Sequence, residues 1–108
     1  MKLFYLALSL IFFFIPFSIL GETMSDLIWN NGLYYKKGSK NPFDGIVTGE
    51  INGSFINGKK HGKWTRYYNN GRVFSISNYY LGLKNGSFIT FSKNGQYIEK
   101  GKYKPSTS

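Results

Sequence analysis

The feature that most constrains the fold is a repeat with a period of 24 residues in the second half of the chain. When the sequence is shifted on itself by 24 residues, glycines align with glycines and aromatic residues with aromatic residues, without a gap. The aligned sets are Phe55, Tyr79 and Tyr103; Gly58 and Gly82; Gly62 and Gly86; Trp64 and Phe88; Tyr67 and Phe91; and Gly71 and Gly95. A period of this length is typical of supersecondary units that stack on one another.

Each unit has the pattern of a β-hairpin. Residues 63–68 and 87–92 form short aromatic runs, and residues 72–80 and 96–103 form longer runs in which apolar and polar residues alternate. Asn-Gly joins the runs at 70–71 and 94–95, and this pair tolerates the positive φ that both central positions of a tight hairpin turn require. We therefore predict an all-β fold, a meandering antiparallel sheet of stacked hairpins with about six strands.

A more irregular copy of the unit precedes the two regular ones. YYKKG at 34–38 is similar to YYNNG at 67–71, and PFDGIV at 42–47 is similar to KKHGKW at 59–64. The predicted organisation is a linker at 22–33, a repeat sheet at 34–104 and a tail at 105–108. Within the sheet we expect a degraded unit at 34–54 and regular units at 55–78 and 79–102.

Residues 1–21 have the layout of a secretory signal peptide. Lys2 is followed by an apolar run from Leu3 to Leu20, with small residues near a plausible cleavage point after Gly21. An uncleaved membrane anchor and a buried helix are the alternatives, and an anchor of this length would be short. We predict an exported protein, periplasmic or extracellular, with a signal helix or anchor before the sheet.

The composition limits the chemistry. The chain has 14 lysines and arginines against five acidic residues, a formal net charge of +9, and no cysteine. No disulfide or thiolate metal site can form, so a small domain of this kind must be stabilised by packing.

No set of residues indicates catalysis. His61 is the only histidine and has no carboxylate near it in its repeat, which favours a turn residue over a general base or metal ligand. Asp44 and Glu50 are the one candidate acid/base pair, and Asp44 occupies a turn position of the repeat. We expect no enzyme activity, no cofactor and no metal.

Basic and aromatic residues lie together in the regular units and form the candidate interaction set. Its members are Lys60, Lys63, Trp64, Arg66, Tyr67, Tyr68, Phe88 and Phe91. Such a surface suits anionic lipid, lipopolysaccharide or cell-wall polymer, and export makes nucleic acid an unlikely ligand. The alternative interpretation is structural: the aromatic residues form the core, and the lysines keep a thin sheet soluble and protect its edges. Open edges also make a homodimer plausible.

The spacing Gly58, Gly62, Trp64, Tyr67 and Gly71 resembles the MORN repeat, most closely its bacterial variant, found in small proteins of which some are described as YwqK-like antitoxins. The resemblance covers about residues 34–104, and Phe88 and Phe91 replace the tryptophan and tyrosine in the second regular unit. It implies a sheet of hairpins without a catalytic site, and a role in protein interaction, dimerisation or membrane attachment.

The leading functional hypothesis is a non-catalytic, exported module for protein or envelope-surface interaction. The alternatives are attachment to anionic lipid or cell-wall polymer, an antitoxin-like role, which export argues against, and a small enzyme acting on wall polysaccharide.

Overall fold

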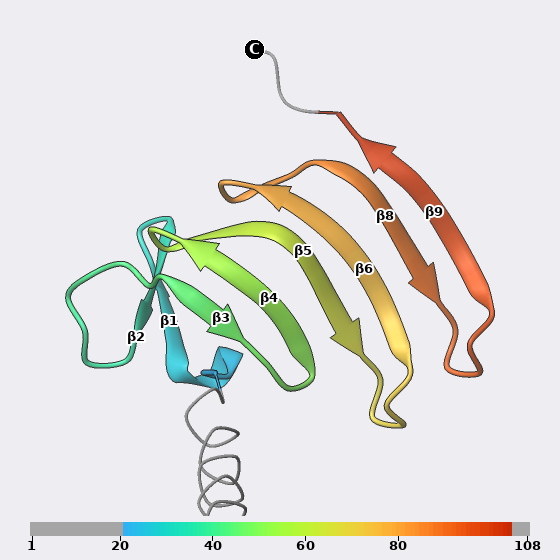
Figure 1. Cartoon of the computed structure of the whole chain (residues 1–108), viewed down its shortest axis with the longest axis horizontal. Helices are drawn as coiled ribbons and strands as arrows, with labels where there is room; N and C mark the ends of the chain where they lie inside the picture. Colours follow the sequence, from blue (N-terminus) through green and yellow to red (C-terminus); the bar gives the residue numbers. More distant parts are fainter. Residues whose placement is uncertain (1–20, 105–108) are drawn as a thin grey trace, which may run out of the picture.

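The structure is a computed structural model that describes residues 21–104. These residues form one 3-10 turn and nine strands (Figure 1). The elements are η1 (Met24–Asp26), β1 (Leu27–Asn30), β2 (Leu33–Lys36), β3 (Gly45–Val47), β4 (Ile51–Ile56), β5 (Lys59–Tyr67), β6 (Val73–Tyr80), β7 (Leu83–Lys84), β8 (Gly86–Phe91) and β9 (Tyr97–Tyr103). The predicted signal helix and the tail at 105–108 lie outside the described residues.

Strands β3 to β9 form one antiparallel sheet in which neighbours in sequence are neighbours in space (Figure 1). The order is β3-β4-β5-β6-β8-β9, and the short β7 pairs with the end of β6. Strands β1 and β2 pair only with each other, as a separate hairpin. The prediction of an all-β, antiparallel fold is confirmed, with more strands than the six expected.

The 24-residue period governs the backbone as well as the side chains. The strand register shifts between Arg66 and Tyr67 and again 24 residues later, between Thr90 and Phe91. Gly62 and Gly86 both have positive φ, at 82° and 72°. Because the two units share these irregularities, their strands bend in the same way.

The tight turns lie at a different place in the unit from the one predicted. Two-residue turns with positive φ at both positions occur at Asn57-Gly58 and at the repeat-equivalent Leu81-Gly82, and also at Asn31-Gly32. At 70–71 only Gly71 has positive φ, and Tyr68 N donates to Arg72 O across a three-residue loop. The expectation for Asn70-Gly71 and Asn94-Gly95 was therefore wrong, because one extra loop residue removes the need for positive φ at asparagine.

Aromatic side chains lie flat over glycines on one face of the sheet, which we call the core face. A Cβ atom on Gly53 would lie 2.2 Å from Cδ2 of Trp64, and one on Gly101 would lie 2.9 Å from the ring of Phe88. Trp64 and Phe88 are one 24-residue period apart, and Gly53 and Gly101 are two periods apart. The repeat therefore places each of these two rings beside a glycine of the neighbouring strand.

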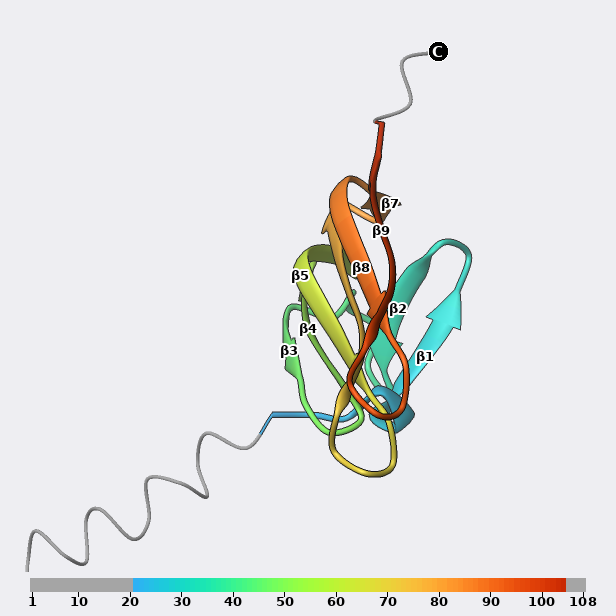
Figure 2. The same ribbon diagram turned by 90° about the vertical axis from the view of Figure 1, so that its right-hand side faces the viewer.

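The β1–β2 hairpin covers one end of the core face. Figure 2 shows it standing to one side of the main sheet. Leu27 of β1 is buried together with Val47, Phe55 and Trp64, and these four residues form the core of the described structure. Residues 22–33, predicted to be a linker, thus contain a 3-10 turn and a core strand. The Asn31-Gly32 turn was the signal for this hairpin, because it returns the chain so that β1 pairs with β2.

Replacing Gly53 with alanine should lower the free energy of unfolding by about 3 kcal/mol, because the new methyl group overlaps the Trp64 ring. Gly101→Ala is the matched variant at the equivalent position. It should cost about 1 kcal/mol, because the Phe88 ring is less buried and can move. Urea unfolding of both variants measures the difference, and equal costs would contradict this packing.

Candidate functional site

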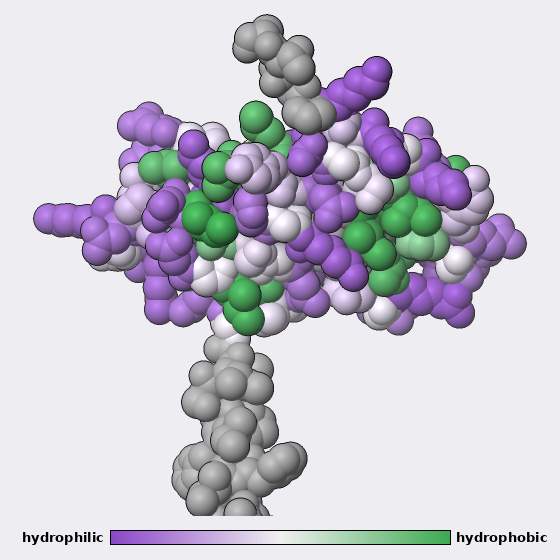
Figure 3. Space-filling model, turned by 45° about the horizontal axis from the view of Figure 1, so that its top comes forward, coloured by the Kyte–Doolittle hydropathy of each residue, from purple (hydrophilic) through white to green (hydrophobic). Residues whose placement is uncertain are grey.

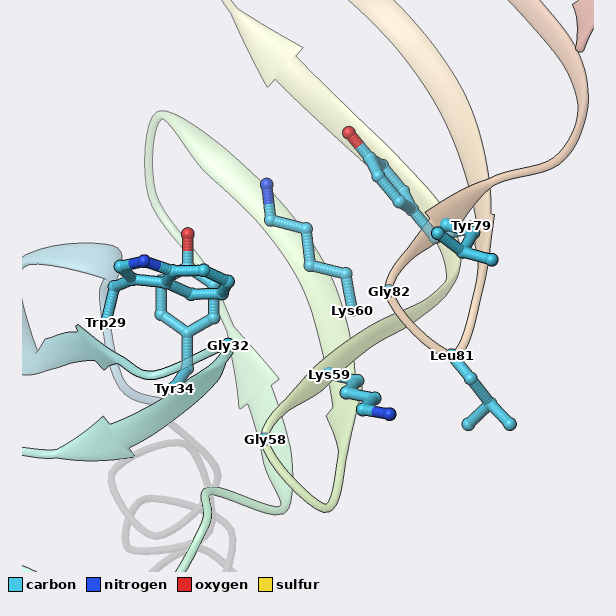
Figure 4. A pocket seen from close by; sticks show the side chains of 10 residues that line it. Trp29, Gly32, Tyr34, Gly58, Lys59, Lys60, Tyr79, Leu81 and Gly82 are labelled. Atoms are coloured by element: carbon cyan, nitrogen blue, oxygen red, sulfur yellow. The ribbon is translucent and has the colours of Figure 1, made fainter. Parts of the chain in front are cut away.

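Three tight turns converge on a hollow at the end of the core face. The turns are those of the β1–β2, β4–β5 and β6–β7 hairpins, and the hollow has a volume of about 350 Å³. It is lined by Trp29, Gly32, Tyr34, Gly58, Lys59, Lys60, Tyr79, Leu81, Gly82 and Leu83 (Figure 4).

Backbone hydrogen bonds hold the turns against one another. Tyr34 N donates to Gly58 O at 2.8 Å, and Gly82 N donates to Lys60 O at 2.7 Å. Gly58 itself has a φ of 78°, and a Cβ there would lie 3.0 Å from Tyr34 O. Glycine at this position is therefore required both by the turn and by the close approach of the β1–β2 hairpin.

Lys60 is the central charged group of the hollow. Its side chain extends into the space between Trp29 and Tyr34 on one side and Tyr79 on the other (Figure 4). Its ammonium lies 4.9 Å from the ring centre of Trp64 and 5.2 Å from that of Tyr79. Within residues 21–104 it forms no ion pair, since the one salt bridge there joins Lys36 and Glu22 at 2.8 Å.

Burial lowers the pKa of Lys60 below its ordinary value, and the charges of Arg66 and Lys84 lower it further. The ring faces of Trp64 and Tyr79 offset part of this cost, because they attract a cation. An anion bound in the hollow would offset the remaining free-energy cost of keeping the Lys60 ammonium charged there. Lys60 is thus a half-buried cation for which the described residues provide no counter-ion.

Apolar side chains at the rim remain in contact with solvent. Trp29 is 60% exposed and Leu83 is 62% exposed. The Trp29 ring is held by Tyr34, with ring centres 5.2 Å apart, and Tyr34 in turn packs on Phe55. An exposed indole that is fixed by its neighbours offers a ready face for a flat ligand, because little side-chain freedom is lost on binding.

The hollow also lies close to an unpaired donor. Trp64, whose ring lies beneath the Lys60 ammonium, is only 3% exposed, and its Nε1 has no hydrogen-bond partner among the described residues. Buried donors without a partner are uncommon in folded proteins.

The structure does not bring the predicted interaction residues together on one surface. Strand alternation places Trp64, Arg66 and Phe88 on the core face and Lys63 and Phe91 on the opposite face, which we call the outer face. Of the predicted set, only Lys60 lines the hollow, with Trp64 buried beside it.

The remaining aromatic residues of that set have structural contacts. The Tyr68 hydroxyl donates to Phe91 O at 2.7 Å, and the Tyr68 ring packs on Phe74 with centres 5.0 Å apart. Tyr67 pairs with Val73 at the strand irregularity of β5 and β6. The hydrogen bond from Tyr68 to Phe91 joins the two regular units, and the other two contacts lie within the first of them. Trp29 of β1, Leu81 of the β6–β7 turn and Leu83 of β7 were not predicted from the sequence, because only tertiary contacts between hairpins bring them to the hollow.

The candidate catalytic residues have structural surroundings. Asp44 accepts a hydrogen bond from Asn57 N at 2.7 Å and so supports the β4–β5 turn. Glu50 lies at the other end of β4, where its carbonyl accepts from Tyr67 N, so the two carboxylates do not form a pair. His61 lies within β5 rather than in a turn, and its Nδ1 accepts from Leu81 N at 3.1 Å.

In the described part of the chain, no three His, Cys, Asp or Glu side chains gather closely enough to hold a metal ion. No helix among residues 21–104 is both long and apolar enough to span a bilayer.

No protein-family model matches this sequence, and no curated protein and no solved structure shows significant similarity to it.

Asp44→Ala should lower the free energy of unfolding by about 1 kcal/mol, because Asn57 N loses its acceptor at the turn. Glu50→Ala, at the exposed turn between β3 and β4, is the control and should leave stability unchanged. The comparison uses thermal or urea unfolding. A larger loss for Glu50→Ala would contradict the assignment of a turn role to Asp44.

Lys60→Met should not lower stability at neutral pH, because it removes a half-buried charge that the fold disfavours. The lowered pKa of Lys60 means that the unfolded chain binds its proton more tightly than the folded one. The native chain should therefore gain stability relative to the variant as the pH rises through the folded-state pKa toward 10.5. Lys59→Met, at the exposed neighbour, is the control for loss of a lysine.

Proposed function

We propose that this protein is a non-catalytic, exported binding module that holds an anionic envelope polymer in the hollow around Lys60. The observation that carries the proposal is the half-buried Lys60 ammonium, which lies over the rings of Trp64 and Tyr79 and has no acidic partner in the described structure. An unpaired cation in a partly dry hollow favours a ligand that brings negative charge.

The wider charge distribution supports an anionic ligand. Lys2 is the only charged residue before Glu22, so 13 of the 14 basic residues and all five acidic ones belong to the part from Glu22 onward. Lys59 lines the hollow, and Lys84 is close enough to affect the pKa of Lys60. This excess of positive charge would draw an anionic polymer toward the hollow before any specific contact forms.

The shape and lining of the hollow favour a sugar polymer among anionic ligands. The exposed Trp29 ring offers a flat apolar face, and Leu81 and Leu83 add apolar surface on the opposite side. The apolar faces of sugar rings pack on such surfaces, while a uronate or similar acidic group would reach Lys60. Figure 3 shows that apolar patches on one face of the molecule are small, separate and bordered by hydrophilic residues, a pattern that fits a mixed polar and apolar ligand.

The expectation of an envelope-surface module rests on predicted export together with the basic and aromatic residues of the repeat units. Export rests on the signal-like sequence at 1–21, which lies outside the described residues. Lipid attachment, an antitoxin-like role and a wall-polysaccharide enzyme have no observation that favours them over polymer binding.

Tryptophan fluorescence of the full 108-residue chain in neutral detergent tests the proposal. The chain has two tryptophans, and Trp29 is exposed whereas Trp64 is buried, so a ligand in the hollow should change the emission of Trp29. Titration with a soluble polyuronate should shift the emission, and the neutral polymer dextran should not. Trp29→Phe should remove most of the emission change, and Lys60→Met should weaken binding at least about tenfold, as expected for loss of a charge-assisted contact.

The same binding should weaken at alkaline pH as Lys60 loses its proton, and the affinity should begin to fall at a lower pH than expected for an ordinary lysine. Absence of any emission change with polyuronate would contradict the proposal. If mixed micelles of the detergent with phosphatidylglycerol give a Lys60-dependent change that micelles with phosphatidylcholine do not, the ligand is anionic lipid instead.

A further inference from the structure

The two edges of the sheet differ. At the first edge, Glu22 bridges to Val47 of β3, and Thr48 N donates to Glu22 O at 2.8 Å. At the other edge, β9 pairs with β8 on one side, and no strand within residues 21–104 pairs with its other side. Tyr97 and Ile98 of β9 are more than 60% exposed.

Comparison with the equivalent strand of the preceding repeat unit indicates how a partner strand could pair with the free side of β9. Strand β6 is equivalent to β9 by the 24-residue shift, and β6 pairs with β8 on the side that corresponds to the free side of β9. There Ser75 pairs with Thr90 and Ile76 with Ile89. The same register shift precedes both strands, so β9 presents its backbone groups in the geometry that accepts a strand in β6.

The side chains at these positions differ in charge between the two strands. The equivalents of Ser75 and Ile76 are Glu99 and Lys100. Asn78 of β6, whose amide donates to Ser87 O at 2.9 Å, corresponds to Lys102. Lys100 and Lys102 lie on the outer face, where they line a hollow of about 500 Å³ together with Ile76 and Ile89. Where β6 offers neutral side chains to its neighbour, β9 offers two cations on the outer face and one anion on the core face.

We propose that the free side of β9 binds an extended acidic segment of a protein partner by β-strand addition. The backbone groups of β9 would supply the hydrogen bonds of an antiparallel ladder. Lys100 and Lys102 would select acidic residues at alternate positions on the outer face of the added strand. Glu99 would select a basic residue on the core face of that strand.

A second copy of β9 is a poorer occupant on electrostatic grounds. Two β9 strands related by a two-fold axis would keep their outer faces on the same side of the joined sheet. Lysines would face lysines in pairs centred on residues 100 to 102, and the two Glu99 side chains would face each other in a pair centred on residue 99. Like charges directly opposite one another destabilise a strand pair. The other edge of a second copy is occupied at Val47 by the Glu22 segment. Charge complementarity therefore favours an acidic partner over self-association.

The test uses peptides whose sequence follows β8, the strand that occupies the equivalent place beside β6. Acidic residues replace Ser87 and Ile89 of GSFITF and a lysine replaces Thr90, which gives GEFEKF with blocked ends. The control peptide GKFKEF has the same composition of backbone and aromatic residues with reversed charges. Binding of both to the full 108-residue chain in neutral detergent is measured by fluorescence anisotropy, and the site is located by hydrogen exchange of the β9 amides.

GEFEKF should bind more tightly than GKFKEF, should slow hydrogen exchange along β9 and should weaken with salt. The double variant Lys100→Glu/Lys102→Glu should reverse the preference between the peptides. The ratio of the two affinities should change by about tenfold or more, because two exposed charge pairs, each contributing modestly, both change from attraction to repulsion. The double variant should leave the Trp29 emission change with polyuronate, and its dependence on Lys60, in place even if the lower net charge weakens the affinity, which separates this site from the proposed function.

Equal affinity for the two peptides, or protection of amides outside β9, would overturn the proposal. A concentration-dependent dimer of the native chain that protects β9 and excludes GEFEKF would overturn it as well. If the double variant fails to fold, Lys102→Gln alone should still reduce the preference for GEFEKF, and an unchanged preference would count against strand addition.

Discussion

The contact of Trp64 with Gly53 is the interaction on which the rest of the structure depends. The main sheet is a single layer, so a large ring can be buried only by lying across the backbone of a neighbouring strand and under the β1–β2 hairpin. Gly53 provides the space for the ring, and Phe55 closes it from the side with ring centres 5.0 Å apart. Without the space at Gly53, Trp64 could not be buried, and the small core would lose its largest side chain.

The same arrangement recurs without a cover at the far end of the sheet. Phe88 lies over Gly101 and packs against Tyr103 with ring centres 4.7 Å apart, but no second hairpin lies over it among the described residues. The regular units thus have similar local packing and different burial. The difference comes from the β1–β2 hairpin, which belongs to the irregular first part of the chain and converts one end of a repetitive sheet into a core.

The candidate site is a consequence of that asymmetry. Where the hairpin meets the sheet, its turn and two turns of the sheet leave a hollow with Lys60 at its centre. The ammonium lies partly dry and without a counter-ion from residues 21–104, which is unfavourable for the free protein and favourable for an anionic ligand. The opposite edge, β9, has backbone groups and charges exposed to solvent instead, so the two proposed surfaces use different chemistry and lie at different ends of the fold.

The sequence by itself determined the strand-rich fold, the hairpin repeat and the equivalence of Trp64 with Phe88, because glycine and aromatic spacing acts through local backbone geometry. It also indicated that Asp44 serves a turn. It did not indicate that Asn31-Gly32 belongs to a hairpin that covers the sheet, nor that Trp29, Lys60 and Leu83 meet in one hollow. Those facts were decided by the tertiary structure, since they depend on where a short, irregular hairpin docks. Docking of this kind is set by shape and burial across segments distant in sequence, which leave no periodic signal in the chain.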